Sequence, residues 1–187
     1  MVVPASSAEF VGGHANRESP HAMATLPPPP ADYALRVPRV GEAGELVSVG
    51  PDHLGREALL SPQAARAWCA MRECAFADGI ELILVSAFRS MARQSEILAG
   101  KLAKGMTLEE ALEYSAYPGF SEHHSGNAID IGTCGVSHLE EEFETTPAFL
   151  WLADHARSFG FALSYPRGNS RGIAYEPWHW CHHSTTA

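Results

Sequence analysis

The chain has 187 residues, a hydrophobic content of 45%, a formal net charge of −9 at neutral pH and a pI of about 5.5. These values are typical of one globular domain, and the acidic balance excludes the basic face that binds nucleic acid or anionic lipid. No apolar stretch approaches the ~20 residues of a membrane-spanning helix, so we expect no membrane span. We also expect no nucleic-acid partner, because of the charge, and a monomer.

The N-terminal segment, residues 1–30, is rich in Ala, Ser, Gly and Pro and ends in consecutive prolines, Pro27 to Pro30. This composition predicts a flexible leader, followed by a single folded domain over residues 31–187. The leader has neither the basic nor the apolar region of a secretory signal. We therefore expect a cytoplasmic protein, or a periplasmic or cell-envelope protein if a signal has been removed.

Helices and one buried strand are predicted in the first half of the chain. Ser61-Pro62 is typical of a helix start, and the helix is expected to end at Gly79. Its apolar residues at helical spacing are Ala64, Trp68, Met71 and Ala75. The apolar run from 80 to 88 predicts a buried strand. Further helices are expected over residues 90–103 and from the capping box at 107–110 to Pro118-Gly119.

The second half predicts more strands than helices. We expect a short strand over residues 128–131, then a helix that begins at Thr146-Pro147 and ends at Gly160. Two strands, 161–165 and 172–180, are expected to be joined by a turn at 166–168, and the acid-rich segment 140–144 to be a solvated loop. The pattern favours an α+β fold with helices packed on a small, mostly antiparallel sheet.

The cysteines do not indicate a zinc knuckle, because none of them forms a Cys-x-x-Cys pair. They are Cys69, Cys74, Cys134 and Cys181. We expect buried free thiols, and a disulfide remains open because the sequence cannot place one.

A histidine and an aspartate in Ser121-Glu-His-His-Ser-Gly-Asn-Ala-Ile-Asp130 are candidates for a metal site. Asp130 lies in an apolar strand, where an unpaired carboxylate would be costly to bury. A metal ion held with His123 would offset that cost. A salt bridge or a hydrogen-bonded loop anchor would also do so, and a lone histidine is more often a satisfied polar residue than a ligand.

Glu176-Pro-Trp-His179 supplies a second histidine and a second carboxylate. A regular strand points residues three apart to opposite faces, but Pro177 interrupts the alternation, so both can approach one site. Two imidazoles and one carboxylate can hold zinc with a position left for water, and a further carboxylate can act as the base. The alternative is an aromatic-rich strand with an incidental histidine.

Arg89 directly follows the predicted buried strand of residues 80–88. A guanidinium fixed at a strand end can polarise a carbonyl or hold a carboxylate. A surface arginine is the alternative.

Three segments, taken in order, resemble the VanY-type D-alanyl-D-alanine carboxypeptidases. They are Ser86-Ala-Phe-Arg-Ser90 with Gln94, Ser121-x-His-x-x-Gly-x-Ala-x-Asp130, and Glu176-x-Trp-His179. This family belongs to the group of lysostaphin, the D-Ala-D-Ala metallopeptidases and sonic hedgehog. The resemblance covers roughly residues 50–181 and implies the fold of that group.

The resemblance also implies residue roles. The zinc ligands would be His123, Asp130 and His179. Glu176 would be the general base and later the acid that protonates the leaving amine, and Arg89 would stabilise the oxyanion. Ser121 and Gln94 would lie on the substrate side, with Ser121 near the terminal carboxylate.

The sequence departs from the family pattern at several positions. His124 stands where the family often has glutamine, and Ala87 replaces a frequent glycine. The last strand is followed by Cys181-His-His-Ser184 instead of the usual Arg-Tyr-Val-Gly. His124, His182 and His183 therefore compete as ligands, and the seven-residue spacing to aspartate favours His123.

The resemblance predicts a zinc-dependent carboxypeptidase that removes a C-terminal D-alanine from peptidoglycan stem peptides, with D,D- or L,D-specificity. A D,D-dipeptidase or a peptidoglycan endopeptidase with the same site is the alternative within enzymes, and segments 100–120 and 133–146 are expected to decide between them by closing the cleft. The other alternative is a non-catalytic binding module stabilised by zinc. Glu176 and Arg89 argue against it, since structural zinc sites need neither.

Overall fold

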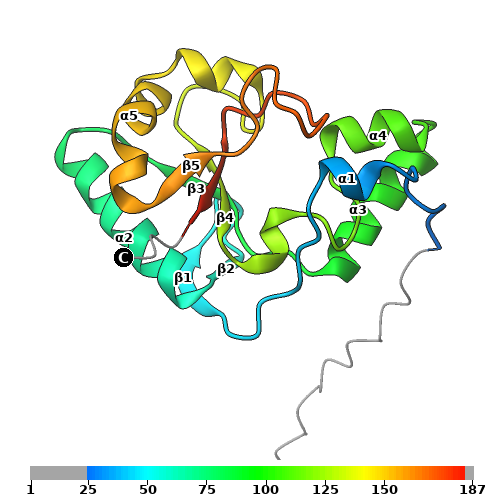
Figure 1. Cartoon of the computed structure of the whole chain (residues 1–187). Helices are drawn as coiled ribbons and strands as arrows, with labels where there is room; N and C mark the ends of the chain where they lie inside the picture. The colour runs from blue at the N-terminus through cyan, green and yellow to red at the C-terminus, as the bar shows by residue number, and fades with distance from the viewer. Residues whose placement is uncertain (1–24, 184–187) are drawn as a thin grey trace, which may run out of the picture.

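The computed structural model describes residues 25–183, which form the predicted α+β fold (Figure 1). The α-helices are α1 (Tyr33–Arg36), α2 (Pro62–Ala77), α3 (Met91–Ala103), α4 (Leu108–Tyr114) and α5 (Pro147–His155). Short 3₁₀ helices are η1 (Glu122–Ser125), η2 (Glu141–Thr145) and η3 (Ala156–Phe159). The strands are β1 (Val47–Pro51), β2 (Glu57–Leu60), β3 (Ile83–Ser86), β4 (Ala128–Gly132), β5 (Phe161–Leu163) and β6 (His179–His182).

The strands form two antiparallel sheets. β1 and β2 make a two-stranded sheet, which the sequence analysis did not predict. The other strands form a four-stranded sheet in the order β3-β4-β6-β5. Every residue of β4 is buried, so this inner strand carries a polar side chain only where that side chain is satisfied by neighbours.

Helix α2 packs on the main core and follows its prediction closely. The Ser61 hydroxyl accepts a hydrogen bond from the Ala64 amide at 3.3 Å, and Gly79, with φ of +77°, follows the C-terminus. The predicted apolar positions of this helix are all 0% exposed. They pack with residues of β3, β4, β6 and α5 in one hydrophobic cluster. Truncating Trp68 to alanine in this cluster would cost about 3–5 kcal/mol.

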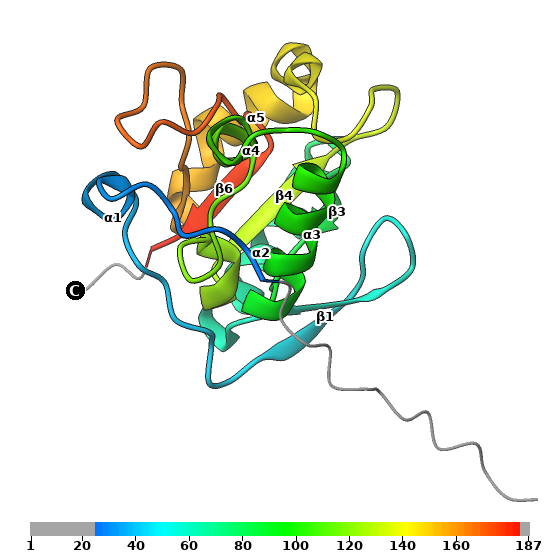
Figure 2. The ribbon, with the colours of Figure 1, turned by 90° about the vertical axis from the view of Figure 1, so that its right-hand side faces the viewer.

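A second, smaller hydrophobic cluster joins α1, α3 and α4. Its buried residues include Tyr33, Leu98, Leu112 and Phe120. In Figure 1 these helices lie on one side of the strands, while α2 and α5 lie on the other, and Figure 2 views the molecule from the side of α3. Leu26 also packs against this cluster.

The leader predicted over residues 1–30 falls outside the described residues up to residue 24. From Leu26 onward the chain contacts the small cluster, and the Tyr117 hydroxyl donates a hydrogen bond to the Pro27 carbonyl at 3.3 Å.

The prediction of a strand over residues 172–180 is wrong for most of these residues. The turn at 166–168 is present, with the Asn169 amide bonded to the Pro166 carbonyl at 3.1 Å, but the chain then stays irregular until β6 begins at His179. The Asn169 side chain bonds the carbonyls of Pro166 and Ile173, at 3.0 and 2.8 Å, and Pro177 has no amide hydrogen. Local hydrogen bonds and the proline thus replace the strand ladder.

Other predictions need smaller corrections. The strand expected over 80–88 is limited to β3, and the helix expected to run to Gly160 is α5 continued by the tighter η3. The acid-rich segment forms η2 at the surface, where Glu141 and Glu144 both pair with Arg167, at 2.9 and 2.8 Å.

The cysteine thiols are all free, but the prediction that they are buried holds only in part. Cys181 is buried and Cys69 is partly buried, whereas Cys74 and Cys134 are exposed, so that prediction is wrong for these two. Cys74 is an exposed residue of α2 that flanks the buried face of the helix. Among the described residues, no helix has the length and apolar character needed to cross a membrane.

Candidate metal centre

The register of β4 against β6 brings Asp130 and His179 together. The two residues are direct partners in this antiparallel pair, so their side chains lie side by side on one face of the sheet. The His179 Nδ1 atom is 3.0 Å from Asp130 Oδ1. The strand ladder therefore sets this half of the site.

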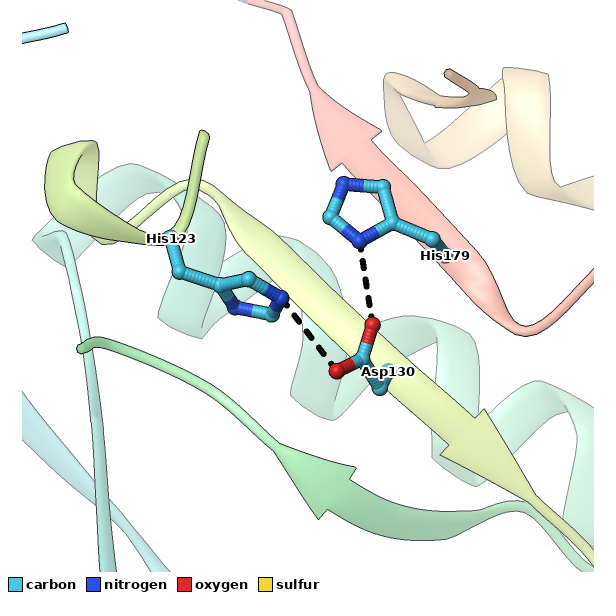
Figure 3. A group of neighbouring side chains, drawn as sticks. All are labelled: His123, Asp130 and His179. Carbon is cyan, nitrogen blue, oxygen red and sulfur yellow. Dashed lines mark hydrogen bonds and ion pairs between the residues drawn. The ribbon is translucent and has the colours of Figure 1, made fainter. Parts of the chain in front are cut away.

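His123 reaches the same face from η1, the short helix before β4. Gly126 ends η1 with φ of +69°, and a Cβ atom there would lie 2.8 Å from the Ser61 backbone nitrogen. Only glycine fits this turn, which directs the chain into β4. The His123 Nε2 atom then lies 3.2 Å from Asp130 Oδ2, and Figure 3 shows both histidines facing the carboxylate.

The three predicted ligands lie together with the chemistry of a zinc site. One donor atom from each of His123, Asp130 and His179 lies within 4.8 Å of the others, and these residues are 3–4% exposed. The His123 Nδ1–H group donates to the Ala87 carbonyl at 2.7 Å, which leaves the Nε2 lone pair free to bind a metal. Two nitrogens and one carboxylate oxygen match a catalytic zinc centre with an open position.

Glu122 completes the surroundings of His179 and was missed by the sequence analysis. Its Oε2 atom is 3.1 Å from His179 Nε2 and accepts a hydrogen bond from the Ser164 hydroxyl at 2.5 Å. Its other oxygen pairs with the Arg171 guanidinium. A glutamate beside the predicted ligand His123 was visible in the sequence, but nothing there placed it against His179.

The electrostatics of the cluster favour a cation. Burial alone would raise the pKa of Asp130, but the charges and hydrogen bonds of the two histidines hold it well below its usual range. Burial alone would lower the pKa of His179, but its hydrogen bonds with Asp130 and Glu122 raise it to about 10. A metal ion would replace the Nδ1 proton that this environment stabilises. Burial opposes ionisation of Glu122 too, yet hydrogen bonds from His179, Ser164 and Arg171 keep its pKa well below the usual range.

Glu176 lies beside this cluster, in the turn that precedes β6. The His179 amide bonds the Glu176 carbonyl at 3.1 Å, and a Glu176 carboxylate oxygen is 3.8 Å from His179 Nδ1. Burial raises the pKa of the Glu176 carboxyl to about 7, and a cation at the three ligands would lower it. Glu176 is therefore a carboxylate near the ligands, positioned by the turn and not by the strand that was predicted.

Arg89 points into the same cleft and is held by its neighbours. Its guanidinium donates to the Gln94 side-chain oxygen at 2.9 Å and to the Ser86 hydroxyl at 3.1 Å, and lies 3.7 Å from Asp130. Gln94 is 0% exposed and donates in turn to the Ala116 carbonyl at 2.7 Å. Gln94 thus contacts Arg89 and does not line the cleft, unlike the substrate-side position that the resemblance implies.

The cleft over the three ligands has a volume of about 580 Å³. Its walls include Ser121, which is 5% exposed, and Lys101, Tyr114 and Leu139 from the two segments predicted to close it. The Lys101 ammonium forms no ion pair with a carboxylate of the described residues and contacts the Tyr114 carbonyl at 3.4 Å. A second cavity, of about 450 Å³, adjoins this cleft. Arg89 and Asp130 line both the cleft and the second cavity.

The competing histidines lie outside the ligand cluster. The His124 Nδ1–H group donates to the Arg89 carbonyl at 2.5 Å, and its Nε2 atom accepts the Gly119 amide at 3.1 Å. Both nitrogens are thus engaged by backbone. His182 packs against Gly160 and Phe161, and the His183 amide bonds the Gly160 carbonyl at 2.9 Å. None of these residues lines the cleft.

Known proteins resemble the chain in sequence and in structure. The chain matches the family VanY: D-alanyl-D-alanine carboxypeptidase over residues 57–185. The D-alanyl-D-alanine carboxypeptidase of Enterococcus faecalis (strain ATCC 700802 / V583) is 35% identical over an alignment of 118 residues, and the alignment covers 58% of this chain and 42% of that protein. The chain spans less than half the length of the first curated relatives that it matches.

Solved structures of two peptidases superpose on the chain. The LdcB LD-carboxypeptidase superposes with a TM-score of 0.70 at 31% identity, over 78% of this chain and 71% of that one. A mutant of the vancomycin resistance D,D-pentapeptidase VanY, in complex with Zn(II), superposes with a TM-score of 0.56 at 28% identity. The superposition covers 74% of this chain and 78% of that one. Because the family match covers well over half of the chain and includes all the ligand positions, the chain belongs to the VanY family of D-alanyl-D-alanine carboxypeptidases.

Proposed function

We propose that this chain is a zinc-dependent carboxypeptidase that removes a C-terminal D-alanine from peptidoglycan stem peptides. The observation that carries the proposal is the convergence of His123, Asp130 and His179 within 4.8 Å beside Glu176, in a chain of the VanY family. The donor set fits zinc, which when bound would polarise the scissile carbonyl and lower the pKa of the attacking water. We further propose that it acts as a monomer in the cell envelope, where its substrate occurs.

Glu176 moves the proton in this mechanism. Its carboxylate accepts a proton as water attacks the carbonyl carbon of the scissile peptide bond. The tetrahedral carbon then expels the amine of D-alanine, and Glu176 returns the proton to that nitrogen as the carbon–nitrogen bond breaks. A carboxylate serves both roles best when its pKa lies near the working pH, and burial moves the pKa of Glu176 in that direction.

Arg89 stabilises the negative charge that develops on the carbonyl oxygen. Its guanidinium is fixed by Gln94 and Ser86, so it needs little reorganisation when the charge appears. We propose that Gln94 acts through Arg89 by holding its orientation, and that it does not contact the substrate.

The terminal carboxylate of the substrate has two candidate partners in the cleft, Lys101 and Ser121. Lys101 is half-buried, and burial lowers its pKa while the nearby charge of Glu176 raises it. A half-buried ammonium that forms no close ion pair with a carboxylate of the described residues favours an anionic ligand. The second cavity, beyond Arg89, gives room for the rest of the stem peptide.

Purified muropeptides with tripeptide, tetrapeptide and pentapeptide stems test the proposal, with products read by mass. Loss of a single D-alanine from the pentapeptide or the tetrapeptide is expected and distinguishes D,D- from L,D-specificity. Release of a D-Ala-D-Ala dipeptide or cleavage of cross-links would replace the proposal with the dipeptidase or the endopeptidase. A zinc-loaded protein that leaves every stem intact would be a binding module.

A further inference from the structure

Glu122 is a buried carboxylate that takes no part in the mechanism described above. It does not line the cleft, and it lies against the Nε2 atom of His179, 3.1 Å away, while Asp130 faces Nδ1. The imidazole of His179 is therefore held between two carboxylates, and only the one on the Asp130 side belongs to the ligand cluster.

The position of Glu122 determines which nitrogen of His179 is available. A neutral imidazole has one N–H group and one lone pair, and a carboxylate can only accept a hydrogen bond. Glu122 accepts the Nε2–H group, so when a metal ion replaces the Nδ1 proton, the lone pair lies on Nδ1, which faces Asp130 and the other candidate ligands. The opposite tautomer would place a lone pair against a carboxylate and an N–H group in the metal site.

Glu122 is itself fixed by groups from the segment between β5 and β6. The Ser164 hydroxyl and the Arg171 guanidinium satisfy its two oxygens, and the Arg171 carbonyl accepts a hydrogen bond from Arg36 at 2.8 Å. That segment also carries Glu176. A carboxylate with these partners keeps its charge and orientation, and so can orient the ring that it contacts.

The two histidine ligands are oriented by different means. His123 donates its non-ligand N–H group to a backbone carbonyl, that of Ala87, whereas His179 donates to a side chain. Only the second orientation can be removed by a point mutation.

We propose that Glu122 is the positioning residue of the metal centre: its carboxylate holds the Nε2–H group of His179, selects Nδ1 as the donor and thereby sets the zinc affinity. The proposal rests on the zinc site of the proposed function. Loss of an outer hydrogen-bond partner of a ligand histidine typically weakens metal binding about 10–100-fold.

The test measures the zinc dissociation constant of the whole protein by competition with a chelator. We expect a loss of about 100-fold in Glu122→Ala and about 10-fold in Glu122→Gln, whose amide keeps one acceptor but loses the charge. Glu144→Gln is the matched control, because it removes a glutamate–arginine pair to the same segment, at Arg167, without touching His179. We expect its zinc affinity to equal that of the wild type.

Two further measurements separate positioning from general destabilisation. The ¹⁵N spectrum of the zinc-loaded wild type should show an N–H group at Nε2 of His179, and that signal should shift in Glu122→Gln. Excess zinc should restore D-alanine release in Glu122→Gln. Wild-type zinc affinity and an unchanged Nε2 signal in Glu122→Gln would overturn the proposal, even if Glu122→Ala fails to fold. Wild-type protein that binds zinc but releases no D-alanine would instead refute the proposed function and leave the role of Glu122 intact.

Discussion

The cleft lies between a strand wall, formed by η1, β4, β6 and the turn before β6, and a helical wall, formed by α3 and α4. The three candidate ligand residues of the strand wall are 3–4% exposed, and each is hydrogen-bonded or ion-paired to a neighbour. On the helical wall Tyr114 is 56% exposed, and Lys101 makes one long hydrogen bond. The helical wall also belongs to the smaller hydrophobic cluster.

Under the proposed function, this difference corresponds to two tasks. Groups that carry chemistry need fixed positions, because misplacement by about 1 Å can cost 10²-fold in rate. Groups that recognise the end of a peptide can sit on a more exposed surface and still contribute useful binding energy. Changes on the strand wall should therefore act on metal binding and kcat, whereas changes on the helical wall should act on KM.

The largest effect is expected for Asp130→Ala on the strand wall. Removing this buried carboxylate leaves two ligands and takes away the partner that stabilises positive charge on His179. Zinc content should fall from about one per chain toward zero, and D-alanine release should become undetectable. Asp154→Ala, an exposed position on α5, is the control. Full zinc content in Asp130→Ala would mean that the metal lies elsewhere.

Glu176→Gln should come next, since it keeps the shape of the side chain and removes the base. We expect zinc to remain bound while kcat falls about 10²–10⁴-fold. Zinc stoichiometry, melting temperature and D-alanine release should be measured on one preparation. A joint fall in zinc affinity and melting temperature would make Glu176 a fourth ligand, and an active, zinc-loaded variant would contradict both roles.

Arg89→Lys tests whether the guanidinium geometry matters in addition to its charge. A lysine cannot keep the separate hydrogen bonds to Gln94 and Ser86 that hold Arg89 in place. We expect kcat to fall about 10²-fold, the usual effect of losing one oxyanion donor. Arg72→Lys, at an exposed position on α2, should leave the kinetics unchanged. Wild-type kcat in Arg89→Lys would make Arg89 an ordinary charged residue of the cleft.

Lys101→Met should have the smallest effect and should sharpen the contrast between the walls. If Lys101 binds the terminal carboxylate, the variant should show a KM about fivefold higher for the free acid, equivalent to ~1 kcal/mol, with kcat nearly unchanged. A substrate with an amidated C-terminus should bind both proteins equally. Lys104→Met, exposed just after α3, is the matched control. An unchanged preference for acid over amide in Lys101→Met would assign carboxylate recognition to Ser121.

Local features of the fold were predictable from the sequence because their causes are local. Ser61-Pro62 begins α2, the capping box at Thr107 begins α4, and the apolar spacing from Ala64 to Ala75 marks the buried face of α2. The grouping of His123, Asp130 and His179 was predictable for another reason: their residue types suit a metal ion, and their order along the chain resembles that of the VanY family. The irregular segment before β6 was not predicted, because Asn169 and Pro177 act against a ladder that Ile173 and Tyr175 favour.

What the sequence determined by itself was therefore the family and the candidate residues for its chemistry. Only the tertiary structure decided that Asp130 faces His179 across two strands, that Glu122 lies behind His179, and that Gln94 turns toward Arg89. It also placed Lys101 on the wall opposite the ligands. The physical reason is that such contacts join residues far apart in the chain, and they depend on strand register and helix packing, which no local pattern of side chains encodes.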